Sequence, residues 1–229
     1  TFFRHEYRKI ADIVHTVSFE SAEDLIEAHG IPSEKVKVIY NPVEPQTLLQ
    51  KAKEPVMEEW LQEGNNTFIA AARLVSQKRY DIMLKSWHLF SLTEQFQNSS
   101  PGYKLIICGN GEQEGALTLL AEQLNLKDSV KFLGFQKNPW KYVSKAKFFI
   151  STSEWEGLSC SLIESQFLGV PIIASDCPSG NKEILLNGEA GILFENKNSN
   201  DCYQKIIKIA SLTADERKRV IGHAQKNLF

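Results

Sequence analysis

From about residue 65 onwards, short apolar runs alternate with longer segments of helical periodicity. The apolar runs are bounded by glycine, proline and polar residues, which is typical of buried strands. Strands are expected over residues 67–72, 103–108, 130–133, 148–151, 171–174 and 191–194. Helices are expected over residues 80–96, 112–124, 140–145, 181–186 and 201–210, and another after residue 158. Strands that alternate with helices form right-handed βαβ units, so the pattern predicts an α/β fold with a doubly wound, mostly parallel sheet.

The chain before residue 65 has a different pattern. Residues 13–18 and 36–40 predict two short strands, and residues 21–29 predict a helix between them. Residues 2–10 are basic and aromatic and are compatible with the end of another helix. One helix between two short strands buries little apolar surface, so this part of the chain is expected to complete a sheet whose other strands lie elsewhere.

The length of the chain and the positions of its prolines and charges suggest how it is divided into domains. The 229 residues suffice for one full domain and part of another. Residues 1–43 are expected to be the last part of an N-terminal domain. Residues 44–64, with Pro42 just before them, combine Pro45 and Pro55 with many charges, which predicts a linker that carries a short helix. Residues 65–229 are expected to form the complete α/β domain.

Three loops with cations, glycines or aromatic residues follow the first three strands of this domain. Ligands of doubly wound sheets bind outside the carboxyl ends of the strands, where these loops are expected to meet. The two cations suit phosphate, although two solvated surface cations would look the same. The glycine loop permits close backbone approach or simply a tight turn, and the aromatic loop would flank a flat ring or belong to the core. These residues are Arg73 and Lys78, Gly109 and Asn110, and Phe135 and Gln136.

The turn from strand 148–151 into the next helix carries the clearest chemical signal. Such a turn aims free N–H groups and the positive end of the helix dipole at one point, which favours phosphate. Glu156 precedes the helix and Glu164 lies within it, so two carboxylates bracket the anion site. A nucleotide sugar has hydroxyls on both sides of its diphosphate and would fit. Two simpler interpretations stay open, namely that Glu164 completes a capping box with Ser161 and that Glu156 is a solvated loop acid.

Composition and charge exclude some functions. The formal net charge of -2 gives no support to nucleic-acid binding. No apolar stretch reaches the roughly 18 residues that a membrane-spanning helix needs. The four cysteines have neither zinc nor disulfide spacing, which favours free thiols in a reducing compartment and a cytoplasmic location. Contact of the basic N-terminal segment with the cytoplasmic face of a membrane is the alternative to an ordinary solvated helix face.

Five motifs occur in a specific order between residues 67 and 211. Glu156 and Glu164 have seven residues between them in Glu-Gly-Leu-Ser-Cys-Ser-Leu-Ile-Glu-Ser, and Leu-Gly-Val-Pro-Ile-Ile-Ala-Ser-Asp follows. Upstream stand the Arg-x4-Lys spacing, the turn Gly-Asn-Gly-Glu and the strand end Phe-Leu-Gly. Together they resemble the C-terminal, donor-binding domain of a GT-B-fold retaining glycosyltransferase of family 4 (glycosyl transferases group 1). The resemblance implies a Rossmann-like domain, the C-terminal half of a GT-B fold, preceded by a short remnant of the N-terminal domain.

The resemblance implies a role for each motif residue. Arg73 and Lys78 would neutralise the donor diphosphate and stabilise the leaving nucleoside diphosphate, and they count with Glu156 as catalytic. Glu156 would bind hydroxyls of the transferred sugar and stabilise positive charge at its anomeric carbon. Glu164 would accept hydrogen bonds from the ribose. The glycine turn, the loop near the base and the N–H groups at the helix start would supply the other donor contacts. Those residues are Gly109, Asn110, Phe135, Gln136, Gly157, Leu158 and Ser159.

The implied reaction is hexosyl transfer from a nucleotide diphosphate sugar to a glycan, lipid-linked or protein acceptor, with retention of anomeric configuration, in glycan or polysaccharide biosynthesis. Residues 177–184 resemble family members that use UDP-sugars, so UDP is preferred over GDP or ADP. The resemblance implies neither a metal nor a cofactor besides the donor substrate.

Two further functions compete with this one. Family members normally carry a complete acceptor-binding N-terminal domain, of which only the last helix and strand are expected here. This chain alone is therefore expected to bind the donor but to transfer poorly or not at all. A module that works only with a partner chain supplying the acceptor half is one alternative, which exposed apolar surface along residues 1–20 would favour. A non-catalytic nucleotide-sugar sensor is the other, and the intact Arg73, Lys78, Glu156 and Glu164 argue against it.

Overall fold

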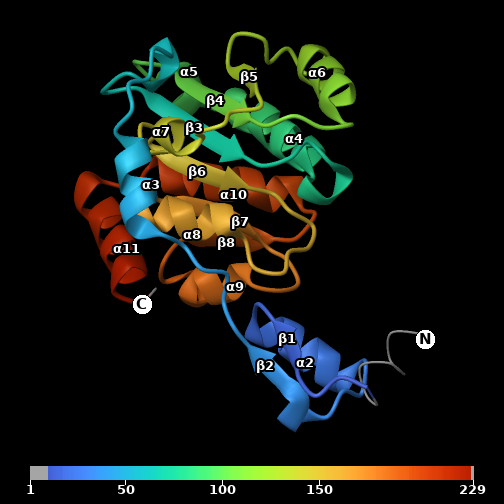
Figure 1. The fold of residues 1–229 in the computed structure, drawn as a ribbon. Coiled ribbons are helices and arrows are strands. Elements are labelled where there is room, and N and C mark those ends of the chain that lie inside the picture. The colour runs from blue at the N-terminus through green and yellow to red at the C-terminus, as the bar shows by residue number, and fades with distance from the viewer. Residues whose placement is uncertain (1–9, 228–229) are drawn as a thin grey trace.

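The computed structural model describes residues 10–227, which contain a large sheet and a small one. The large sheet consists of β3 (Asn66–Ala71), β4 (Tyr103–Cys108), β5 (Val130–Gly134), β6 (Phe148–Ser151), β7 (Ile172–Asp176) and β8 (Ile192–Glu195). The strands lie in the order β5-β4-β3-β6-β7-β8, and every neighbouring pair is parallel (Figure 1). The order reverses between β3 and β6, as in a doubly wound sheet. The predicted fold class is therefore confirmed.

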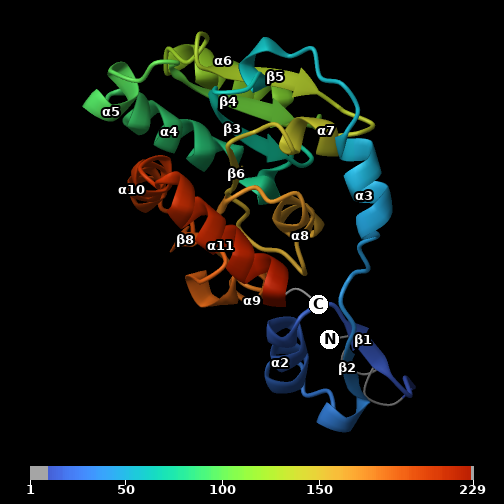
Figure 2. The same ribbon diagram turned by 90° about the vertical axis from the view of Figure 1, so that its left-hand side faces the viewer.

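Helices cover both faces of this sheet. They are α3 (Pro45–Ala52), α4 (Tyr80–Ser91), α5 (Glu94–Gln97), α6 (Glu114–Gln123), α7 (Trp140–Val143), α8 (Cys160–Phe167), α9 (Asn181–Ile184), α10 (Ser199–Ala210) and α11 (Ala214–Asn227). Short 3-10 turns are η1 (Ser33–Lys35), η2 (Glu59–Leu61), η3 (Ser76–Lys78) and η4 (Leu186–Gly188). Figure 2 shows α4 and α10 on one side of the sheet and α7 and α8 on the other.

Each face of the sheet has its own apolar core. Phe68 of β3 points into the core under α4, α6 and α10, where it meets the rings of Trp87 and Phe148. The next residue, Ile69, points into the opposite core with Leu162 of α8. Successive side chains of a strand alternate between faces, and both faces are covered. This is why the strands are continuous apolar runs in the sequence.

The structure corrects the helix predicted over 80–96. The helix α4 ends at Ser91, and α5 begins at Glu94. Thr93 separates the two helices because its hydroxyl accepts a hydrogen bond from the Phe96 N–H at 3.2 Å, which makes it the N-cap of α5. The other predicted elements of the α/β domain lie within a few residues of their expected positions. No element was predicted for α11, whose polar sequence lacks a clear apolar stripe.

Residues 10–40 form a small unit beside the large sheet. The strands β1 (Val14–Thr16) and β2 (Val36–Val38) pair in parallel, and α2 (Phe19–Glu27) packs on them. The unit contacts the large domain through Glu183, which accepts from the Phe19 N–H at 3.0 Å and from the Tyr40 hydroxyl. The helix end suggested for residues 2–10 lies outside the described residues, except for its last residue.

Candidate functional site

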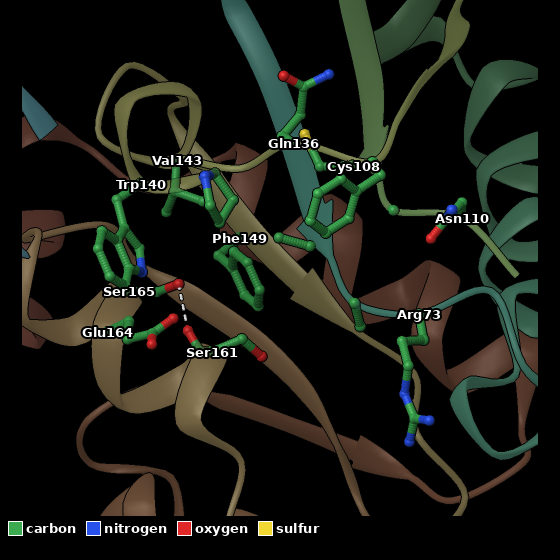
Figure 3. A pocket seen from close by; sticks show the side chains of 15 residues that line it. Arg73, Cys108, Asn110, Gln136, Trp140, Val143, Phe149, Ser161, Glu164 and Ser165 are labelled. Carbon is green, nitrogen blue, oxygen red and sulfur yellow. Dashed lines mark hydrogen bonds between the residues drawn. The ribbon is translucent and has the colours of Figure 1, made fainter. Parts of the chain in front are cut away.

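A cavity of about 200 Å³ lies between the carboxyl ends of β3 and β4 and the helix α8 (Figure 3). This is where the strand order reverses, the usual ligand position in a doubly wound sheet. The structure brings six of the predicted site residues together around the cavity, with Arg73 and Glu164 toward opposite sides of it in Figure 3. These residues are Arg73, Gly109, Asn110, Phe135, Gln136 and Glu164.

The glycine loop after β4 is shaped by its contact with the loop after β3. Gly109 has a φ of +145°, and a Cβ added there would lie 1.9 Å from the Ala72 carbonyl oxygen. The Leu74 N–H donates to the Asn110 carbonyl at 2.9 Å, which ties the two loops together. The glycine is therefore required for close approach of the backbone, and that contact holds the Arg73 loop beside the cavity.

Arg73 is the available cation of the cavity. Its side chain is exposed, and among residues 10–227 it forms no ion pair with a carboxylate. A guanidinium has five N–H donors in a planar fork, which matches the oxygens of a phosphate group. Arg73 can therefore bind an anion without first breaking an ion pair within the described chain.

The loop after β5 lies on the other rim. Phe135 is 69% exposed, so it is not a core residue. Its ring lines the cavity and is available to contact a flat ligand. Gln136 donates from Nε2 to the Leu133 carbonyl at 2.8 Å, which fixes its amide against the strand end. Its carbonyl oxygen has no partner in this contact and is free to accept.

Glu164 belongs to the cavity and not to a helix cap. The N-cap of α8 is Ser159, which places Glu164 too far into the helix for the capping box that begins at Ser161. Burial raises the pKa of the Glu164 carboxyl. The buried indole N–H of Trp140 lies beside this carboxylate (Figure 3) and favours its charged form, although the two groups are not in hydrogen-bond geometry. The carboxylate thus has acceptor capacity left for a ligand.

Lys78 and Glu156 lie outside the lining of this cavity and pair with each other. The Lys78 Nζ is 2.6 Å from Glu156 Oε1, with side chains 16% and 8% exposed. Ser153 donates to the same oxygen at 2.7 Å. Lys78 and Ser161 line a smaller adjoining cavity, and Ser161 also lines the main one. The Lys78–Glu156 pair therefore stands next to the main cavity.

The loop that carries Glu156 is held at several points. The Glu154 N–H donates to the Gln77 carbonyl at 2.8 Å, and the Gln77 amide donates to the Trp155 carbonyl at 2.7 Å. The Glu154 carboxylate pairs with Arg79 Nη1 at 3.0 Å and with Lys197. The hydrogen bonds from Lys197 and Arg79 lower the pKa of the Glu154 carboxyl. The contacts with Gln77 hold the backbone just before Glu156.

The predicted phosphate-binding amides precede α8 and also lie outside the main cavity lining. Among the described residues, no backbone acceptor pairs with the N–H groups of Gly157, Leu158 and Ser159. Leu158 and Ser159 are buried, and a Cβ added to Gly157 would lie 3.1 Å from Val17 of the small unit. Unpaired N–H groups at a helix start suit an anion, so these amides stay candidates for a donor contact.

Residues 53–227 match the family described as glycosyl transferases group 1, a range that contains every residue of the cavity as well as Lys78 and Glu156. The chain belongs to this family.

This group 1 chain matches only part of the length of its curated relatives. An uncharacterised glycosyltransferase of Methanocaldococcus jannaschii is 35% identical over 182 residues, which are 78% of this chain and 43% of the relative. The Campylobacter jejuni N-acetylgalactosamine-N,N'-diacetylbacillosaminyl-diphospho-undecaprenol 4-alpha-N-acetylgalactosaminyltransferase is 29% identical over 194 residues, 85% of this chain and 49% of that enzyme. The chain thus spans less than half the length of each.

Solved structures share the fold of this group 1 domain. Anabaena HepE, in complex with UDP and glucose, has a TM-score of 0.82 at 21% identity, over 99% of this chain and 61% of HepE. TarM of S. aureus, in a complex that contains UDP, has a TM-score of 0.80 at 22% identity, over 99% of this chain and 42% of TarM. The fold is that of the C-terminal domain of GT-B-type glycosyltransferases.

Sequence reasoning missed three residues at the site of this group 1 domain. Trp140 lines the cavity beside Glu164, but a lone tryptophan at the start of a short helix carries no sequence signal. Ser161 joins the two adjoining cavities. Ser153 supports Glu156 from three residues upstream, and this spacing in a polar turn was the one signal that could have found it.

Between residues 10 and 227, no group of three or more His, Cys, Asp or Glu side chains is arranged to hold a metal ion. Over the same range, no helix has the length and apolar character that spanning a membrane would require.

Proposed function

We propose that this group 1 domain binds a UDP-sugar and takes part in transferring its hexosyl unit, with retention of configuration, to a glycan, lipid-linked or protein acceptor. The observation that carries the proposal is the cavity at the reversal of strand order, which combines the cation Arg73 with the half-buried acceptor Glu164. A diphosphate needs positive charge and ribose hydroxyls need acceptors. UDP is preferred over GDP and ADP because the related folds of HepE and TarM are seen with UDP.

The donor would extend from the main cavity toward the Lys78–Glu156 pair. Phe135 and Gln136 would contact the base, Glu164 would accept from the ribose, and Arg73 would pair with the diphosphate. Gly109 and Asn110, with the unpaired N–H groups before α8, would complete the donor contacts. The six cavity residues then hold the nucleotide, and the neighbouring pair faces the sugar.

Lys78 and Glu156 would act as a coupled pair in the transfer. An ammonium group has three N–H donors, so Lys78 can keep its hydrogen bond to Glu156 and still donate to a phosphate oxygen. Negative charge that develops on the leaving UDP would then meet Lys78 and Arg73, while Glu156 binds sugar hydroxyls and stabilises positive charge at the anomeric carbon. The hydrogen bonds of residues 154–156 hold this loop in place before the donor binds.

Calorimetric titration with UDP, GDP and ADP tests the proposal. Arg73→Ala and Glu164→Ala each remove one charge-assisted contact and are expected to weaken UDP binding by about 1.5–3 kcal/mol, or roughly 10- to 150-fold. Arg219→Ala and Glu23→Ala remove the same charges from exposed positions outside the cavity and should leave the affinity unchanged. Absence of binding at millimolar nucleotide, or equal losses in the controls, would contradict the proposal.

We propose in addition that the donor sugar is the only small molecule required, without a metal or a cofactor. Arg73 and Lys78 supply the positive charge that a divalent cation provides at many diphosphate sites. UDP affinity measured in EDTA should therefore equal that measured with Mg²⁺. A large gain in affinity with Mg²⁺ would show that the two cations do not suffice.

A second candidate is a donor-binding module that works only with a partner chain supplying the acceptor half. The side chains of Ile10, Ile13 and Ile39 favour it, because they are 69%, 63% and 61% exposed on the small unit. Apolar surface of this kind commonly marks a protein–protein contact. A cytoplasmic setting, in solution or at the cytoplasmic face of a membrane, fits either candidate, since all four cysteines are free thiols.

A further inference from the structure

A second cavity, of about 600 Å³, lies at the opposite edge of the large sheet, where β3 and β6 begin. It is bounded by residues 61–65, by residues 144–147 before β6, and by the first turn of α11. It shares no lining residue with the donor cavity. Its volume falls in the range of small-molecule sites, roughly 300–1,000 Å³.

Positive charge dominates the lining of this second cavity. Lys145, Lys147 and Arg217 line it, against the single carboxylate of Glu63. Within residues 10–227, none of the three cations forms an ion pair with a carboxylate. The chain as a whole has a formal net charge of -2, so this patch does not reflect a generally basic protein.

The two inner cations are held in place by neutral partners. Lys147 donates from Nζ to Asn66 Oδ1 at 2.6 Å, and Arg217 donates from Nη1 to the Leu212 carbonyl at 2.5 Å. Each contact uses one donor and leaves others for a ligand. Burial and the nearby charge of Arg217 lower the pKa of Lys147. Two half-buried cations without a counter-charge repel each other, and a bound anion would relieve that repulsion.

We propose that this cavity binds a phosphate-bearing ligand, with Lys147 and Arg217 on the phosphate and Lys145 at the exposed rim. The space is larger than a phosphate group alone needs, and the polar side chains of Gln62, Asn65 and Ser144 line the remainder. The site thus suits a sugar phosphate or another phosphorylated small molecule, or the phosphate of a lipid headgroup. It does not depend on the donor cavity.

Titration of the isotope-labelled 229-residue chain with inorganic phosphate and pyrophosphate, followed by NMR, tests this site. Saturable shifts are expected at the backbone amides of Gly64 and Asn65, separate from any shifts at Gly109. Lys147→Gln and Arg217→Gln are each expected to weaken the response at Gly64 and Asn65 about tenfold, since each removes a charge-assisted contact.

The matched control is Arg219→Gln, which removes one charge from an exposed position of the same helix, outside the cavity. It should leave the affinity for phosphate unchanged. If Lys147→Gln fails to fold, as judged by circular dichroism, Arg217→Gln and Lys145→Gln carry the test. Equal weakening by Arg219→Gln would overturn the proposal, because the response would then report net charge and not a site.

Vesicles of phosphatidylcholine with and without phosphatidic acid separate the two sources of phosphate. Binding of soluble phosphate and pyrophosphate assigns the site to a free phosphorylated ligand. Binding only to phosphatidic acid vesicles, lost in Arg217→Gln, assigns it to a lipid headgroup. Absence of a response to soluble anions and to vesicles overturns the proposal, whatever the result with UDP at the donor cavity.

Discussion

The ion pair of Lys78 with Glu156 is expected to contribute both to the stability of the fold and to the proposed transfer. Both side chains are mostly buried, and Ser153 is the only other side chain that donates to Glu156 among the described residues. An ammonium or carboxylate left without its partner in such a place loses hydrogen bonds that water cannot fully replace. The role of either residue therefore cannot be measured from activity alone, because substituting it also changes the stability of the fold.

A double-mutant cycle measures this coupling. Lys78→Ala and Glu156→Ala are each expected to lower the free energy of unfolding by about 1–3 kcal/mol, since each strands the other charge. The double variant should be about 1–2 kcal/mol more stable than the sum of the single changes predicts. Urea denaturation of the four proteins gives the values. Simple additivity would mean that the pair contributes no coupling.

The Glu164 carboxylate is expected to lower the free energy of unfolding and to strengthen the binding of UDP. Its raised pKa means that the folded protein binds this proton more tightly than the unfolded chain does. The free energy of unfolding therefore falls as pH rises from the ordinary glutamate pKa through the raised one. Glu164→Gln should remove this pH dependence, increase stability at neutral pH and weaken UDP binding, as measured by denaturation across that pH interval and by calorimetry. The exposed control Glu23→Gln should change neither quantity. A less stable Glu164→Gln protein would show that the carboxylate serves the fold.

At the scale of elements, the glycine loop after β4 decides whether the donor cavity forms. Gly109→Ala places a Cβ against the Ala72 carbonyl and puts a non-glycine residue at φ +145°. It is expected to cost about 2 kcal/mol or more in unfolding free energy and to abolish UDP binding. Gly115→Ala is the matched control, because Gly115 lies in α6 with open space around it. That change should stabilise the protein by about 0.5–1 kcal/mol and spare the affinity. Thermal unfolding and calorimetry of both variants test this, and similar behaviour of the two would contradict it.

The same elements show how far the sequence predicts the structure. Strands such as β4 were predicted to the residue, because a strand buried on both faces is a continuous apolar run. The break between α4 and α5 was not, because the apolar period continues through Thr93 while its hydroxyl caps a new helix. The cavity-lining loops after β3, β4 and β5 could be predicted because they follow the ends of parallel strands at one edge of the sheet. The pairing of Lys78 with Glu156 could not, because it joins loops 78 residues apart through side-chain geometry.

At the scale of the whole molecule, the small unit of residues 10–40 lies against the large domain near Glu156. Glu183 of α9 accepts from both Phe19 and Tyr40, and burial and the Glu183 carboxylate raise the pKa of Tyr40 to about 12. Val17 of the same unit approaches Gly157 in the loop that carries Glu156. Under the proposed function, residues 10–40 would lie where an acceptor-binding part meets the transferred sugar.

The 229-residue chain is accordingly expected to bind UDP-sugars without turning them over at a useful rate. Under the proposed function, the donor would contact groups that the described residues bring together. Transfer would also need an acceptor hydroxyl aligned with the anomeric carbon, and such alignment contributes much of a catalysed rate. Calorimetry with UDP and UDP-sugars, and release of UDP over time in the presence of candidate acceptors, separate the two steps. Glu156→Ala gives the background rate. Rapid UDP release that Glu156→Ala abolishes would show that the chain holds acceptor and donor functions together. Tight binding with background release would mean that the reaction waits for the acceptor half, supplied within a longer chain or by a partner.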